Sequence, residues 1–356
     1  MDGYLLIDGN NLAHKALHAY DSKTSEGRDT SVIFGFMEQF ASVRRSFPGN
    51  LPLIVWDGGY RERLRLSKKA VRLGLVPSEY KANRSADKSD PMVASLYDQM
   101  PDLLRLLSLT DIPQIQKRGC EADDVIASYC KRLKGCGKHV LCYTADHDYY
   151  QLADEDVFII SRLAGAEDIM DADSFRERYG LEPPRWVDVG ALMGDAGDNI
   201  HGVPGVGIKT ATALVQEHGD YESVISACCS QFEALRAEYP DLETEADIAR
   251  LRAMRDDDKN PYAGCFPGMP FTGVAMALES GKLKKIRRVL LQIAMYQDRS
   301  KLAYVLKKMN ADLDVPELKL FHRMDELLFW AACERYELTQ LKTWTKLFKN
   351  GGDIGD

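Results

Sequence analysis

The sequence of 356 residues lacks any uninterrupted apolar run that is long enough to cross a bilayer. Its first residues also lack the basic segment and the following apolar segment that a secretory signal requires. These absences exclude a helical membrane protein, and they predict a cytoplasmic protein that has no membrane partner.

Zinc-type cysteine pairs are missing as well. The eight cysteines show no paired spacing typical of zinc sites, and we expect them to be reduced, buried thiols. An excess of positive charge is also missing, because 46 Lys and Arg stand against 54 Asp and Glu, for a net charge of −8. This balance argues against a non-specific polyanion binder. A local basic surface can still bind nucleic acid, since the distribution of charge matters more than its sum.

Aspartates follow three of the short apolar runs that the sequence does contain. The runs 4–7 and 53–56 lead into Asp8 and Asp57, and the run 140–143 is followed by Asp146 and Asp148. These runs alternate with amphipathic stretches, which predicts an α/β fold with a mostly parallel sheet flanked by helices. Since ligand sites of open parallel sheets form at the carboxyl ends of the strands, we expect the aspartates at one such edge.

Further carboxylates open a predicted helix at Glu121, Asp123 and Asp124. Taken alone, these residues could be a solvated helix start, and a single aspartate after a strand is often a turn residue. All of these carboxylates at one sheet edge would repel one another without a cation. Hard oxygen donors favour Mg²⁺ or Mn²⁺, and a two-metal carboxylate site is suited to phosphodiester hydrolysis. We therefore expect two or more divalent ions.

A basic stretch runs from residue 61 to residue 84, where eight Lys or Arg residues accompany two Glu. One exposed helical face could carry these charges, but phosphate contacts explain the excess better. Beyond about residue 185 the chain is predicted to be helical.

A glycine-rich motif lies in this second part of the chain. Asp195 and Asp198 are spaced to face one way on a helical turn, and a glycine-punctuated hairpin leads into a helix that Lys209 and Thr210 open. Bare backbone amides and a helix N-terminus bind phosphate well. The predicted DNA-binding residues are Gly202, Val203, Gly205, Val206, Gly207, Lys209 and Thr210.

With these motifs in this order, the chain resembles the 5′ nuclease family of flap endonucleases and 5′→3′ exonucleases, in its bacterial and phage branch. The resemblance covers roughly the first 215 residues and rests on six matching segments: Ile7 to Gly9, Trp56 to Gly58, Tyr80 to Arg84, Glu121 to Asp124, Thr144 to Asp148, and Gly194 to Ala211.

The resemblance implies a PIN-like nuclease core over residues 1–185 with a helical arch at about 58–110. It implies a helix-hairpin-helix-type module over 186–270 and a C-terminal segment, 271–349, that packs back on the core, before a tail at 350–356. Members of this family can be the front part of a DNA polymerase, but this chain has no room for one, so we expect a free-standing enzyme.

The resemblance also implies a role for individual residues. Lys81 and Arg84 would contact the scissile phosphate, and a K⁺ ion could sit at the hairpin near Val203 and Val206. His201 departs from the proline that the family often has there. The implied metal-binding residues are Asp8, Asp57, Glu121, Asp123, Asp124, Asp146, Asp148, Asp195 and Asp198.

The predicted activity is a metal-dependent 5′ nuclease of replication or repair, which cuts DNA at 5′ flaps and 5′ ends and leaves 5′-phosphates. The predicted partners are DNA with duplex and 5′ single-stranded parts, RNA primers on DNA, and replication proteins, for a monomer in a bacterial or phage-infected cell. Two alternatives remain open: a PIN-type ribonuclease, and a non-catalytic, structure-specific DNA-binding protein.

Overall fold

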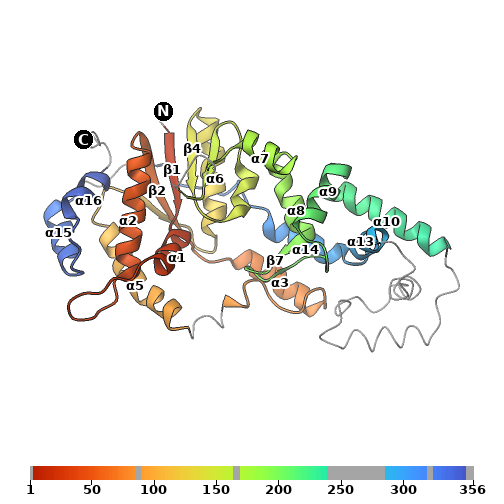
Figure 1. Cartoon of the computed structure of the whole chain (residues 1–356), viewed down its shortest axis with the longest axis horizontal. Coiled ribbons are helices and arrows are strands. Elements are labelled where there is room, and N and C mark those ends of the chain that lie inside the picture. Colours follow the sequence, from red (N-terminus) through yellow and green to blue (C-terminus); the bar gives the residue numbers. More distant parts are fainter. Residues whose placement is uncertain (1–2, 85–89, 163–168, 239–284, 319–323, 350–356) are drawn as a thin grey trace. The chain divides into compact units, whose positions relative to one another are not determined.

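The computed structural model describes residues 3–84, 90–162, 169–238, 285–318 and 324–349. It divides into two compact units, and each unit combines separate stretches of the sequence (Figure 1). The first unit consists of 1–60, 86–175 and 309–356, and the second consists of 61–85 and 176–308. The predicted boundaries near 185 and 270 stay predictions, and residues 239–284 and the tail at 350–356 lie outside the described residues.

A six-stranded sheet forms the centre of the first unit (Figure 1). Its order is β3-β2-β1-β4-β5-β6; the first five strands are parallel, and β6 is antiparallel to β5. This arrangement confirms the predicted α/β class. The strands are β1 (Gly3–Asp8), β2 (Asn50–Trp56), β3 (Gln114–Gln116), β4 (His139–Tyr143), β5 (Val157–Ile160) and β6 (Ile169–Met170).

Helices cover both faces of this sheet, which explains why its strands are almost continuously apolar. Leu5 and Ile7 of β1 share a core with buried residues of α1 (Gly9–Ala19), α2 (Ser31–Ser46) and α5 (Pro91–Leu107). The helix α6 (Ala122–Gly135) packs against β1, β2 and β4. On that side the thiols of Cys130 and Cys142 lie 3.4 Å apart.

The end of the chain also belongs to the first unit. The helices α15 (Glu326–Glu334) and α16 (Leu341–Leu347) pack beside α5 and α2 respectively. The indole of Trp344 donates a hydrogen bond to Glu38 at 2.8 Å, and the rings of Phe348 and Phe40 lie 4.3 Å apart. Two short elements complete this unit's description: the 3₁₀ helix η1 (His147–Leu152) and the helix α7 (Ala172–Tyr179), which leads into the second unit.

The second unit is mainly helical. In it α8 packs against α9 and α14, and α10 packs against α13. No helix of the described ranges combines the length and the apolar character that a membrane crossing needs. The helices are α3 (Arg61–Arg72), η3 (Pro183–Arg185), α8 (Trp186–Met193), α9 (Ile208–His218), α10 (Tyr221–Glu238), α13 (Lys285–Met295) and α14 (Gln297–Lys307).

The helical turn predicted for Asp195 and Asp198 is wrong. Gly194 has a φ of 76° and ends α8, because this left-handed backbone is open to glycine but not to a helix. A small antiparallel hairpin follows, built from β7 (Gly194–Asp195) and β8 (Ile200–His201). The Asp195 carboxylate accepts the backbone N–H groups of Gly197 at 2.8 Å and Asp198 at 3.3 Å, so it caps the hairpin turn.

Candidate active-site residues

The carboxyl ends of β1, β2 and β4 place three predicted residues at one edge of the sheet. Asp8 is the last residue of β1, Asp57 follows β2, and Asp146 lies just beyond β4. Because β2 pairs with one side of β1 and β4 with the other, this edge is the switch point where open α/β sheets form their sites.

Asp8 is the most perturbed carboxyl of this edge. Burial, and then the charge of Asp57, raise its pKa from the ordinary value of 3.8 to about 8, with smaller contributions from Asp146 and Asp123. A hydrogen bond that the backbone N–H of Asn11 donates to Asp8, 2.9 Å long, opposes this shift in pKa. The four carboxylates are therefore near enough to repel one another, and a cation would relieve that repulsion.

Three uncharged residues hold this edge together, and the sequence did not single them out. The Asn10 side chain accepts the N–H of Asp57 at 2.8 Å, and the Asn11 side chain accepts the N–H of Ala145 at 2.9 Å. The hydroxyl of Tyr149 donates to Asp8 at 3.2 Å. Two asparagines directly after the Asp8-Gly9 pair, in the first turn of α1, were the available signal.

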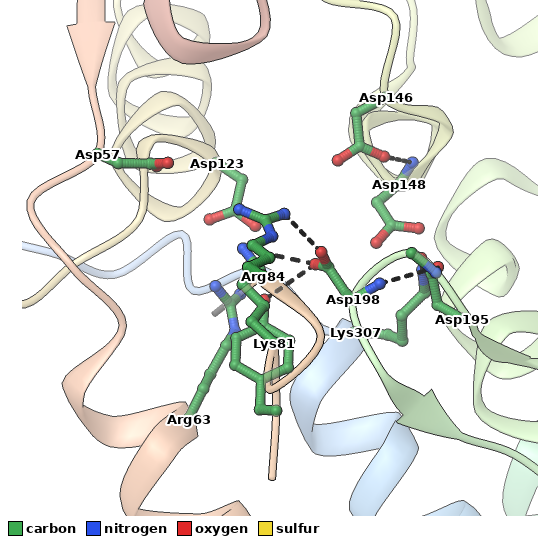
Figure 2. Close-up of polar contacts among 12 residues, drawn as sticks. Asp57, Arg63, Lys81, Arg84, Asp123, Asp146, Asp148, Asp195, Asp198 and Lys307 are labelled. Carbon is green, nitrogen blue, oxygen red and sulfur yellow. Dashed lines mark hydrogen bonds and ion pairs between the residues drawn. The ribbon is translucent and has the colours of Figure 1, made fainter. Parts of the chain in front are cut away.

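The start of α6 brings the next carboxylates to the first unit's site. Asp57 accepts the N–H of Ala122 at 2.8 Å, which ties the end of β2 to the beginning of α6. Asp123 accepts the N–H of Asp124 at 2.6 Å, and Asp124 accepts the N–H of Asn310 at 2.8 Å. The remaining two predicted ligands are Glu121, which is buried, and Asp148, whose N–H donates to Asp146 at 2.8 Å (Figure 2).

These carboxylates have the chemistry of a hard-metal site, but they do not converge on one point. In the part of the chain that the structure describes, no three His, Cys, Asp or Glu side chains are arranged to hold a metal ion. Several of the oxygens instead accept backbone N–H groups. A divalent ion bound here would therefore have to draw the side chains together, and the donor set suits Mg²⁺ or Mn²⁺.

In the second unit, Lys81 and Arg84 surround Asp198 (Figure 2). The Arg84 guanidinium lies 2.6 Å from one carboxylate oxygen, and the Lys81 ammonium lies 3.5 Å from the other. The Tyr80 hydroxyl donates to the same carboxylate at 3.1 Å. The structure thus brings together two motifs that are more than 110 residues apart in the sequence.

The backbone of the second unit fixes this arrangement. Lys81 has a φ of 55°, which is unusual for a residue with a side chain, and its N–H donates to the carbonyl of Asp198 at 2.9 Å. Asn83 donates to the carbonyls of Ala196 and Gly197, at 3.2 and 3.0 Å. The segment that carries Lys81 and Arg84 is therefore docked on the β7–β8 turn through the backbone N–H of Lys81 and the side chain of Asn83.

Asp195 has its own cation, which comes from the end of α14. The Lys307 ammonium lies 2.7 Å from the Asp195 carboxylate (Figure 2). Although burial acts to raise the pKa of Asp195, the charge and hydrogen bond of Lys307 hold it below the ordinary value. Lys307 was not predicted as a site residue, since one lysine at a helix end carries no local signal.

His201 and the following turn complete this side of the second unit. Burial, and then the charge of Arg299, lower the pKa of His201 to about 4, so the imidazole is neutral near pH 7. Val203 and Val206 are buried, while Gly205, Gly207 and Lys209 are exposed. Gly205 has a φ of 75°, which the turn requires, and α9 begins directly afterwards.

Two family models match the chain. The model of the 5'-3' exonuclease N-terminal resolvase-like domain matches residues 3–180, and the model of the 5'-3' exonuclease C-terminal SAM fold matches residues 181–257. The chain belongs to the 5'-3' exonuclease family. This membership confirms the resemblance that we inferred from the sequence motifs of the chain.

Curated relatives of this 5'-3' exonuclease family member are DNA polymerases I. The thermostable enzyme of Thermus filiformis is 31% identical over 257 residues, that of Thermus aquaticus 32% over 255, and that of Mycobacterium tuberculosis 31% over 259. The alignments cover 70–71% of this chain but only 27–28% of the relatives. The chain thus matches less than a third of the length of these polymerases.

Solved structures share the fold over nearly the whole chain. The T5 D15 protein co-crystallised with metal ions has a TM-score of 0.52 at 18% identity, and the match covers 96% of this chain and 97% of that one. The catalytic core of Rad2 in complex with a DNA substrate has a TM-score of 0.54 at 16% identity, over 97% and 92% of the two chains. At these identities the likeness establishes the fold.

Proposed function

We propose that this member of the 5'-3' exonuclease family is a divalent-metal-dependent DNA nuclease. It would hydrolyse phosphodiester bonds at 5′ flaps and 5′ ends and leave 5′-phosphate products, in replication or repair. The observation that carries the proposal is the gathering of Asp8, Asp57, Asp123 and Asp146 at the switch point of the sheet, where their mutual repulsion calls for cations. The family membership of the chain supports it.

The carboxylates of the first unit would hold the metal. When bound, Mg²⁺ or Mn²⁺ lowers the pKa of an attacking water and stabilises the leaving oxygen. Asp8, Asp57, Asp123 and Asp146 would supply the charge, while the N–H groups and hydroxyls that they accept keep them in place. Glu121, Asp124 and Asp148 stay predicted ligands of the first unit. Asp195 and Asp198 were predicted as ligands too, but each is paired with a protein cation in the second unit.

The cations of the second unit would act on the phosphate. Lys81 and Arg84 are paired with Asp198, and each has the charge to bind a non-bridging phosphate oxygen instead. Such cations contribute most when negative charge shifts in the transition state. Because the segment that carries them is already held in place, DNA binding would lose little conformational entropy in ordering it.

The turn before α9 would hold duplex DNA away from the reacting bond. Exposed Gly205 and Gly207 leave backbone N–H groups accessible beside a helix N-terminus, and Lys209 adds a positive charge. These contacts would grip phosphates without reading sequence. The K⁺ site predicted near Val203 and Val206 and the contributions of Gly202 and Thr210 stay predictions.

The polymerases I are much longer than this chain, which matches only 27–28% of their length. The proposed partner is DNA with duplex and 5′ single-stranded parts. RNA primers, replication proteins, a monomeric state and a cytoplasmic location stay predictions.

Cleavage of end-labelled substrates tests the proposal. With Mg²⁺ present, the protein should cut a 5′-flap DNA near the junction and leave single-stranded RNA of the same sequence intact, whereas EDTA should abolish the reaction. Preferred cleavage of the RNA would favour the ribonuclease alternative. Tight binding of flap DNA with no cleavage in Mg²⁺ or Mn²⁺ would favour the non-catalytic alternative.

A further inference from the structure

Lys307 lies outside the residues that the family models match, which end at 257, yet it reaches a predicted metal ligand. We propose that Lys307 is a positioning residue that occupies Asp195 as a built-in cation, so that Asp195 shapes the β7–β8 turn instead of binding a divalent ion. This inference rests on the proposed function, because it concerns where that function's metal ions bind.

Burial of Lys307 shows that the contact is built into the unit. The residue is only 6% exposed, and a buried ammonium is costly unless a carboxylate or another acceptor pairs with it. Its ammonium lies 2.7 Å from Oδ2 of Asp195. A position at the last residue of α14 favours a cation as well, because the helix dipole is negative there.

The packing of α8 leaves room for the Lys307 stem. A Cβ atom at Gly190 would lie 3.1 Å from Cε of Lys307, which is closer than side chains normally approach. Gly190 therefore opens a path for the side chain across α8 toward the hairpin. A lysine that merely sat at a helix end would need no such path.

The oxygens of Asp195 are already engaged. Oδ2 faces Lys307, while Oδ1 accepts the N–H groups of Gly197 and Asp198. A divalent ion at Asp195 would lie close to the Lys307 ammonium, whose like charge opposes binding. Asp195 therefore stabilises the turn that contains Asp198.

Counting bound Mn²⁺ tests this inference. Titration of the whole, DNA-free chain with Mn²⁺, followed by electron paramagnetic resonance, gives the number and affinity of bound ions. Lys307→Met should gain one bound ion, or tighten an existing one by on the order of tenfold, because an uncompensated carboxylate becomes available. The adjacent, exposed Lys308→Met is the matched control and should leave the isotherm unchanged.

Three further variants separate a positioning role from a merely structural one. Lys307→Arg keeps the charge and should restore the wild-type isotherm, and the double variant Lys307→Met with Asp195→Asn should lose the extra ion. Asp195→Asn alone should bind as many ions as wild type, which decides the matter even if Lys307→Met does not fold. An unchanged isotherm in folded Lys307→Met, or a lost ion in Asp195→Asn, would overturn the inference. The titration contains no DNA, so its failure is distinct from a failure to cleave.

Discussion

The carboxylates of the two units differ in the charge of the groups around them. In the first unit, Asp8 is surrounded by like charges, and burial with Asp57 raises its pKa to about 8. In the second unit, Asp195 faces Lys307 and Asp198 faces Lys81 and Arg84, at distances from 2.6 to 3.5 Å. An added cation would therefore stabilise the ionised form of Asp8, while Asp195 and Asp198 already face cations of their own unit.

This difference indicates that the aspartates of the two units have different roles. A buried acid whose pKa is raised by neighbouring carboxylates costs stability when it ionises, and such perturbed groups are typical of functional sites. Acids that have protein cations instead fix local structure, as Asp195 and Asp198 do at the β7–β8 turn.

The largest effect should come from a carboxylate of the first unit. Asp146→Asn should lower the cleavage rate of 5′-flap DNA by at least about 10³-fold, because a metal-ligating charge is lost. Binding of the DNA, measured in Ca²⁺, should change little or tighten as repulsion falls. The control is Asp156→Asn, which lies at the opposite edge of the sheet beside His139. Near wild-type cleavage by Asp146→Asn would remove this residue from the site.

A second-unit cation should matter in the chemical step. Lys81→Met keeps the aliphatic stem but loses the charge, and the single-turnover rate should fall by about 10²-fold. Affinity for flap DNA should fall much less. The exposed Lys69→Met on α3 serves as control. If affinity and rate fell equally, Lys81 would be a ground-state anchor rather than a transition-state contact.

The pH dependence of stability should reveal the raised pKa of Asp8. Since the pKa of Asp8 is raised to about 8, the folded protein holds that proton more tightly than the unfolded chain. Its stabilising contribution is complete below the unfolded value of 3.8 and is lost as the pH rises toward 8. Urea denaturation in EDTA should show a loss of roughly 1–2 kcal/mol between about pH 6 and 8.

Two controls accompany this pH measurement. Mg²⁺ should flatten the slope, because the ion takes over the role of the proton, and Asp8→Asn should flatten it without metal. A slope that is the same in wild type and Asp8→Asn would show that other groups cause it.

The smallest effect should come from the turn before α9. Lys209→Ala should weaken duplex binding modestly and lower the slope of log affinity against log salt by about one. The control is Lys301→Ala, another exposed lysine of the second unit. Identical salt slopes for wild type and Lys209→Ala would show that Lys209 is only a solvated residue of the first helical turn.

The strands and their aspartates could be predicted from the sequence because their signals are local. A short apolar run followed by Asp8, Asp57 or Asp146 predicts a strand and the residue at which it ends. The alternation of such runs with amphipathic helices predicts the parallel sheet. The family motifs of the second half also lie close together in sequence. These features gave the fold class and most of the candidate site.

The pairings across long stretches of sequence could not be predicted. Nothing near Lys81 indicates Asp198, and nothing near Lys307 indicates Asp195, because each pair forms only once distant segments have packed. The spacing of Asp195 and Asp198 misled for a different reason. Residues three apart fit a helical turn as well as a hairpin turn, and only the positive φ of Gly194 decides between them.

The contrast between the two units can be tested most directly by Mn²⁺ binding to the DNA-free chain. Asp146→Asn and Asp198→Asn each remove one charge, one from the first unit and one from the second. We predict that Asp146→Asn loses a bound ion or has an affinity for Mn²⁺ that is weaker by on the order of tenfold, while Asp198→Asn keeps the wild-type isotherm. Equal losses in both variants, or a loss in Asp198→Asn alone, would contradict it.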